Sequence, residues 1–229
     1  MTGPLADPVL EADRILAAAE ADGVVVRLIG GLAIRQLTGE PDPRLARAYK
    51  DIDLVTLKGE GKRLIPVMDA LGYRANDRFN AMQGHSRLLF YDDPNERQVD
   101  VFVGAFEMCH RIPITERAAH HPRTVPPAEL LLTKLQVVKL NEKDLRDILQ
   151  LLLGLRLEEE SPIGSDAIDL AVVAELCAAD WGLWRTSHLT LERVADGVGG
   201  YGLDPDDEQR VRDAAQRILS RIDAEPKGR

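Results

Sequence analysis

The stretch Asp51-Ile-Asp-Leu-Val55 decides how the N-terminal half of this chain is interpreted. It is β-rich, and successive side chains of a strand point to opposite faces of a sheet. Asp51 and Asp53 therefore share one face, while Ile52 and Leu54 share the other. Two carboxylates this close repel each other, and a divalent cation is the simplest compensation. For a pair of this kind taken alone, a polar edge strand facing solvent is the commoner explanation.

A third carboxylate stands in the later stretch Gln98-Val-Asp-Val-Phe102, where Asp100 is flanked by apolar residues. The alternation again indicates a strand. Taken alone, such an aspartate is more often solvent-facing than functional. Three carboxylates that converge from two adjacent strands, however, make a site for one or two Mg²⁺ ions.

A pair of glycines, Gly30-Gly31, stands where the apolar run 24–29 ends and a helical segment begins. Glycines at such a junction let the backbone approach a phosphate, and the first turn of the helix supplies N–H donors. A plain strand-to-helix turn is the alternative. The order of the features along the chain favours the phosphate interpretation more than any one of them does.

The pattern of apolar residues predicts an N-terminal α/β part, residues 1–125, and a helical part, residues 126–229. In the first part we expect a helix from Pro8 to Gly23, strands at 24–29 and 52–57, helices at 32–37 and 61–71, and a hairpin of strands 87–91 and 97–103. After Pro127 strand signals vanish, and we expect helices at 127–140, 142–153, 167–180, 189–197 and 206–223.

The composition is that of an ordinary globular protein, with 229 residues of which 45% are hydrophobic. The net charge of −9 argues against coating a long nucleic acid and suits a bound cation. No apolar run approaches the ~18 residues of a membrane span. The N-terminal residues lack a signal-peptide pattern, and the two cysteines form no CxxC pair. We therefore expect a cytoplasmic protein without a membrane partner.

The series of strand, Gly-Gly, helix, Asp-x-Asp strand, helix, and a later strand with an aspartate resembles the nucleotidyltransferase superfamily. That superfamily includes polymerase β-like enzymes and antibiotic nucleotidyltransferases. The resemblance covers roughly residues 24–153. It is nearest to the abortive-infection toxin-type and antibiotic branches, because a long segment with basic residues precedes the aspartate pair, namely Arg44, Arg47 and Lys50.

The resemblance implies an α+β fold in which a small mixed β-sheet core, flanked by helices, is followed by a helical C-terminal part. It implies a Mg²⁺-dependent enzyme that moves an NMP from an NTP to an acceptor hydroxyl and releases pyrophosphate. Gly30 and Gly31 would bind the triphosphate, and the metal-binding and catalytic residues would be Asp51, Asp53 and Asp100.

The acceptor stays open between an RNA 3′ end, as in the toxin branch, and a small hydroxylated molecule, as in the antibiotic branch. A toxin would also have an antitoxin protein as its partner. The alternative from another class is a non-catalytic module that binds nucleotides or regulates a partner. The presence of all three carboxylates speaks against that alternative.

A further resemblance lies in the helical part, where Lys134 stands at the edge of an apolar stripe formed by Leu131, Leu135 and Val138. The next expected helix carries Asp144 and Asp147 on the flank of its own stripe. Abortive-infection toxins similarly have a lysine followed by a helix with two aspartates. The resemblance implies that Lys134 contacts nucleotide phosphates and that the two aspartates support the site. The alternative is a helix hairpin with a solvated charged flank, on which Lys–Asp pairs contribute a few tenths of a kcal/mol.

Overall fold

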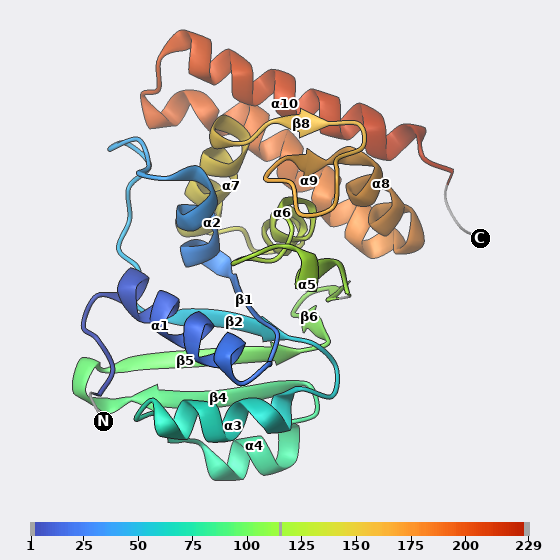
Figure 1. Ribbon diagram of the computed structural model, residues 1–229. Coiled ribbons are helices and arrows are strands. Elements are labelled where there is room, and N and C mark those ends of the chain that lie inside the picture. The colour runs from blue at the N-terminus through green and yellow to red at the C-terminus, as the bar shows by residue number, and fades with distance from the viewer. Residues whose placement is uncertain (1–2, 115, 227–229) are drawn as a thin grey trace. The chain divides into compact units, whose positions relative to one another are not determined.

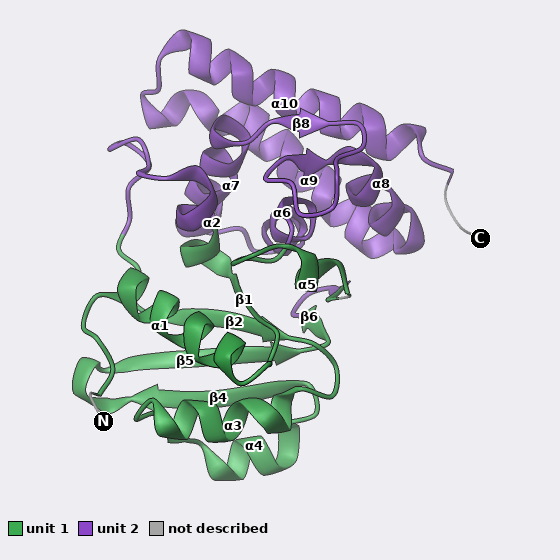
Figure 2. Cartoon of the chain, in the orientation of Figure 1, with its two compact units in different colours: residues 1–33, 48–106, 113–125 green, residues 34–47, 107–112, 126–229 purple. Residues whose placement is uncertain are grey.

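The computed structural model describes residues 3–114 and 116–226, which form two compact units (Figure 2). The first unit contains the residues up to 33 together with 48–106 and 113–125. The second contains 34–47, 107–112 and the residues from 126 onward. Each unit is described by itself. The first two residues of the N-terminal segment considered above lie outside the described part of the chain.

The first unit is built on a five-stranded mixed sheet with the strand order β1-β2-β5-β4-β3 (Figure 1). β2 and β5 are parallel, and the other neighbours are antiparallel. The strands are β1 (Val26–Ile29), β2 (Ile52–Thr56), β3 (Arg74–Ala75), β4 (Arg87–Asp92) and β5 (Arg97–Val103). The expected hairpin at 87–103 is thus confirmed, with a 3₁₀ turn, η1 (Asp93–Asn95), between its strands.

One face of this sheet forms the core of the first unit. Side chains of alternate residues, such as Leu54, Val101 and Phe90, are buried there. Two helices that contact each other and the sheet, α1 (Pro8–Ala21) and α3 (Gly61–Ala70), supply further buried apolar side chains. Two more helices belong to this unit, α4 (Asp77–Gln83) and α5 (Arg117–His120).

The second unit is mainly helical. Its longest helix, α10, contacts α7, α8 and α9 (Figure 1). The helices are α6 (Pro127–Leu135), α7 (Glu142–Gly154), α8 (Leu170–Ala179), α9 (Trp181–Gly197), the 3₁₀ helix η2 (Val198–Tyr201) and α10 (Pro205–Ala224). A pair of short parallel strands, β8 (Leu157–Glu158) and β9 (Ile168–Asp169), lies among them. The chain passes between the units within α2 (Gly30–Thr38), β6 (Ala105–Glu107) and β7 (Arg111–Pro113).

The fold class is as expected, a small mixed sheet with helices followed by a helical part. Several boundaries were wrong. The helix expected at 127–140 ends at Leu135, which leaves Val138 outside it and 56% exposed. The helix expected at 189–197 begins at Trp181, because the side chain of Asp180 accepts a hydrogen bond from the backbone N–H of Leu183 and caps the helix. Strand signals also continue after Pro127, as β8 and β9 show.

Among the described residues, no helix combines the length and the apolar character that crossing a membrane requires.

A buried carboxylate ties α1 to the rest of the first unit. Glu11 is fully buried, and its oxygens accept hydrogen bonds from the Tyr73 hydroxyl at 2.6 Å and the Leu5 backbone N–H at 2.8 Å. The guanidinium of Arg14 donates two further bonds to it. Burial raises the pKa of Glu11, but the hydrogen bonds from Arg14, Tyr73 and Leu5 outweigh burial, so the pKa is lowered overall.

We expect Glu11→Gln to lower the free energy of unfolding at pH 7 by about 2 kcal/mol, because three donors lose their charged acceptor. A carboxyl with a lowered folded-state pKa contributes stability that is present above its unfolded pKa of about 4.3 and is lost as the pH falls through the folded value. The difference between wild type and variant should therefore shrink between about pH 5 and pH 3 in urea titrations. Glu20→Gln, at an exposed residue of the same helix, is the control and should show no such trend. A difference that does not begin to fall as the pH drops below about 4.3 would contradict the assignment.

Candidate functional site

Two carboxylates lie side by side on the face of the sheet opposite the core. The parallel register of β2 and β5 sets Asp53 opposite Asp100. Residues opposite each other in neighbouring strands point to the same face, with backbones roughly 5 Å apart. The residues that flank Asp53 in β2, Ile52 and Leu54, are fully buried on the other face. The sheet therefore brings together two of the three carboxylates singled out in the sequence.

Asp51 is placed differently, because β2 begins only at Ile52. Its carboxylate is exposed and accepts a hydrogen bond of 3.3 Å from the backbone N–H of Gln98 on β5. The amide of the same Gln98 donates to Asp100 Oδ2 at 2.6 Å. Gln98 thus contacts both Asp51 and Asp100, each through a different group.

Asp100 is compensated by a cation that sequence reasoning missed. Arg87 on β4 donates to Asp100 Oδ1 from Nε at 2.7 Å and from Nη2 at 2.6 Å. Its guanidinium also lies 5.0 Å from the centre of the Phe102 ring. Asp100 is only 5% exposed, so a cationic partner offsets the cost of burying its charge. The antiparallel hairpin pairs Arg87 with Phe102, two residues from Asp100, and this register is the signal that could have revealed the contact.

Gly30 lies against the Asp53 carboxylate at the junction of strand and helix. β1 ends at Ile29, which is paired with Asp53, and α2 begins at the next residue. Gly30 has a φ of +70°, and a Cβ at this position would lie 2.7 Å from Asp53 Oδ2. Only glycine fits both demands. The first turn of α2, which includes Gly31, therefore starts beside Asp53. Backbone N–H groups in the first turn of a helix have no acceptor within the helix.

The donor chemistry at this face fits a divalent cation. Mg²⁺ prefers hard oxygen ligands and is often held by one or two carboxylates plus substrate phosphates. Asp53 and Asp100 supply such oxygens next to each other. Among the described residues, no group of three or more His, Cys, Asp or Glu side chains is arranged to hold a metal ion. The fit is therefore to an ion bound together with a phosphate ligand, and Asp100 would share its carboxylate between that ion and Arg87.

A separate cluster of charges lies within the helical unit. The ammonium of Lys134 on α6 is 2.8 Å from Asp147 Oδ2 and 3.2 Å from Asp144 Oδ1, both on α7. Arg47 donates to the two oxygens of Asp147 at 2.8 and 2.9 Å. The Asp147 side chain is 1% exposed. The Lys–Asp pairs of the alternative considered above are therefore present, but the flank is not fully solvated, since the Lys134 side chain is 13% exposed and that of Asp147 is 1% exposed.

The electrostatics of Lys134 follow from this arrangement. Burial alone lowers the pKa of its ammonium, but the negative charges of Asp147 and Asp144 outweigh burial and raise the pKa. Lys134 is thus held in its charged form. The structure brings Lys134, Asp144 and Asp147 together, as one cluster inside the second unit.

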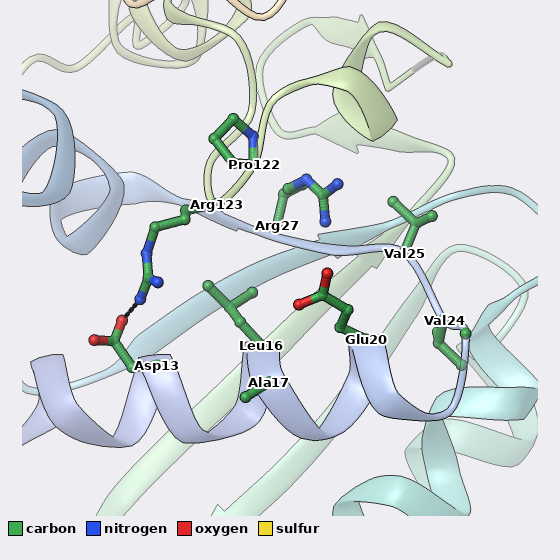
Figure 3. A pocket seen from close by; sticks show the side chains of 10 residues that line it. Asp13, Leu16, Ala17, Glu20, Val24, Val25, Arg27, Pro122 and Arg123 are labelled. Atoms are coloured by element: carbon green, nitrogen blue, oxygen red, sulfur yellow. Dashed lines mark ion pairs between the residues drawn. The ribbon is translucent and has the colours of Figure 1, made fainter.

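A cavity of about 550 Å³ opens beside α1 in the first unit (Figure 3). Its charged groups already have partners. Arg123 forms an ion pair with Asp13, and Arg27 donates to the backbone carbonyls of Ala119 and His121. Burial lowers the pKa of Arg27, and the charge of Glu20 on the cavity wall acts in the opposite direction. We assign no ligand to this cavity.

The sequence matches no model of a known protein family and no curated protein. Among solved structures, the fold is similar to the solution structure of the antibiotic-resistance factor ANT(2'')-Ia. The two chains are 16% identical and superpose with a TM-score of 0.43, and the match covers 62% of this chain and 81% of the other. At these values the similarity supports no conclusion about activity, so the function is argued from the residues of the site.

Gly30→Ala tests the contact between the glycine and Asp53. We expect it to lower the free energy of unfolding by about 2–3 kcal/mol, because it adds a steric clash to the cost of a positive φ. Gly39→Ala is the matched control. Gly39 has a φ of +75° but nothing within 4 Å of a Cβ, so its substitution carries the backbone cost alone, about 1 kcal/mol. Equal losses in denaturant titrations of the two variants would show that Asp53 does not pack against Gly30.

Lys134→Met tests the buried cluster of the helical unit. We expect a loss of about 2 kcal/mol in the free energy of unfolding, because Asp144 loses its cation and Asp147 keeps only Arg47. Lys143→Met removes the same charge from an exposed position of α7 and should change stability by less than about 0.5 kcal/mol. Thermal and urea unfolding measure both values. Equal free energies of unfolding in Lys134→Met and Lys143→Met would mean that the ammonium of Lys134 is solvated.

Proposed function

We propose that this chain is a Mg²⁺-dependent nucleotidyltransferase that moves an NMP from an NTP to an acceptor hydroxyl and releases pyrophosphate. One observation carries the proposal, namely the parallel register that sets Asp53 opposite Asp100 beside the glycine start of a helix. Carboxylates for a cation and backbone N–H groups for a phosphate are thereby adjacent. The resemblance of the glycine and aspartate motifs to the nucleotidyltransferase superfamily supports the same assignment.

Each of these residues has a role that follows from its position. The N–H groups at Gly30 and Gly31 would bind the triphosphate. Asp51, Asp53 and Asp100 would supply the ligands of Mg²⁺. When bound, Mg²⁺ neutralises phosphate oxygens and stabilises the charge that develops during transfer. Arg87 and Gln98 hold the Asp100 carboxylate in a fixed orientation.

The chemical step is an in-line displacement. The acceptor oxygen forms a bond to the α-phosphorus, and the bond from that phosphorus to the bridging oxygen breaks. Pyrophosphate leaves with the electron pair of that bond. The proton of the acceptor hydroxyl passes to the Asp100 carboxylate, which acts as general base. That Lys134 contacts the nucleotide phosphates, with Asp144 and Asp147 in support, stays a prediction.

The net charge of the chain bears on which acceptor we propose. The net charge of −9 favours a small hydroxylated molecule over a large RNA footprint. An RNA 3′ end, with the chain acting as a toxin beside an antitoxin protein, is the other acceptor to be tested. NTP and Mg²⁺ are abundant in the cytoplasm, where the proposal locates the protein.

The test is transfer of label from each α-³²P-labelled NTP, with Mg²⁺, to total tRNA or to aminoglycoside-type molecules. We expect labelled acceptor and free pyrophosphate in one of these arms. Asp53→Asn and Asp100→Asn should each lower the rate at least about 100-fold, because charge stabilisation worth several kcal/mol is lost. Mg²⁺ with NTP should also raise the melting temperature of wild type more than that of Asp53→Asn.

Asp69→Asn, at an exposed residue of α3, is the matched control and should leave transfer and melting temperature unchanged. Full activity of Asp53→Asn would contradict the catalytic assignment. NTP binding that depends on Asp53 but gives no transfer to either acceptor would favour the alternative, a non-catalytic nucleotide-binding or regulatory module. The ion pair between Arg87 and Asp100 is the observation that favours this alternative, because the carboxylate proposed as general base is already bound by a guanidinium.

A further inference from the structure

A second cavity of the first unit lies at the opposite end of β2 from Asp53. Its volume is about 530 Å³, within the range of small-molecule sites. Its apolar lining comes from α3, β4 and β5, and its rim is basic. The residues that the argument uses are Ile65, Leu88 and Val103 in the apolar lining and Lys58, Lys62 and His85 at the rim.

The apolar lining belongs to the core face of the sheet. Leu88 and Val103 are buried and stand on the face opposite Asp100. Gly61 also lines the cavity, and its lack of a side chain leaves the space beside Leu88 and Val103 open. A Cβ on Gly61 would lie 3.1 Å from Val103 Cγ2 and 3.5 Å from Leu88 Cδ1, so any larger residue would intrude on the lining. The cavity can therefore take an apolar ring or chain.

The rim carries positive charge without a matching negative charge. Lys58, Lys62 and His85 are exposed, and neither lysine forms an ion pair with another described residue. No carboxylate is found among the described residues that line the cavity. In a chain with a net charge of −9, most cations have acidic neighbours, as Arg74 and Arg63 do. An unmatched basic rim above an apolar lining fits an anion with an apolar body.

We propose that this cavity is a binding site for an organic anion that carries an apolar ring or chain. The anionic head would lie between Lys58 and Lys62, and the apolar body would contact Leu88, Val103 and Ile65. The site is separate from the proposed catalytic face. Asp53 is three residues before the end of β2, roughly 10 Å along the strand, Lys58 lies in the turn beyond that end, and the cavity is lined by the other face of the sheet.

The test uses 1-anilinonaphthalene-8-sulfonate, whose fluorescence rises in apolar sites, and the uncharged N-phenyl-1-naphthylamine. We expect the double variant Lys58→Gln/Lys62→Gln to bind the sulfonate about five- to tenfold more weakly, because two exposed charge interactions are lost. Binding of the uncharged probe should stay the same. Lys139→Gln/Lys143→Gln, which removes two exposed lysines of the helical unit, is the charge-matched control and should bind both probes like wild type.

A second variant blocks the space instead of removing charge. Ala81 is exposed on α4 and lines the cavity, so Ala81→Trp should fill it and weaken the binding of both probes at least about tenfold with an unchanged melting temperature. Decanoate should displace the sulfonate from wild type. Equal sulfonate affinity in the two double variants, or full binding in Ala81→Trp, would overturn the proposal. Neither outcome bears on nucleotide transfer, which is measured separately.

Discussion

The arrangement of the α/β unit depends on the parallel register between β2 and β5. This register sets Asp53 opposite Asp100 and, at the same time, places Leu54 opposite Val101 in the core. Because side chains alternate along a strand, a shift of one residue in either strand would bury a carboxylate and expose an apolar side chain. The hydrophobic core therefore holds the two carboxylates side by side.

Several buried carboxylates are each paired with the cationic side chain of an arginine or a lysine. Asp100 has Arg87, Glu11 has Arg14, and Asp147 has both Arg47 and Lys134. A buried carboxylate without a cation would be costly, so each of these pairs stabilises the fold around it. Asp53 lies against the backbone of Gly30, where a Cβ would be 2.7 Å from its Oδ2.

The two ends of β2 have opposite chemical character. Its beginning carries Asp51 and Asp53, and the turn after its end carries Lys58 beside an apolar cavity. One strand thus connects a face suited to a cation with its phosphate and a cavity suited to an organic anion. The two sites use different faces of the same sheet, so ligands could occupy both without sharing a contact residue.

The sequence by itself determined the strands of the first unit, the hairpin at 87–103 and the glycine junction at Gly30. These features depend on alternation and on turn residues, which are local in the chain. Only the tertiary structure decided that Arg87 neutralises Asp100 and that Arg47, 100 residues away from Asp147, pairs with it. It also decided that α6 ends at Leu135 and that the partly buried Lys134 lies between two aspartates. The reason is that burial and ion pairing are set by segments distant in sequence, and the local pattern around a charged residue does not contain its partner.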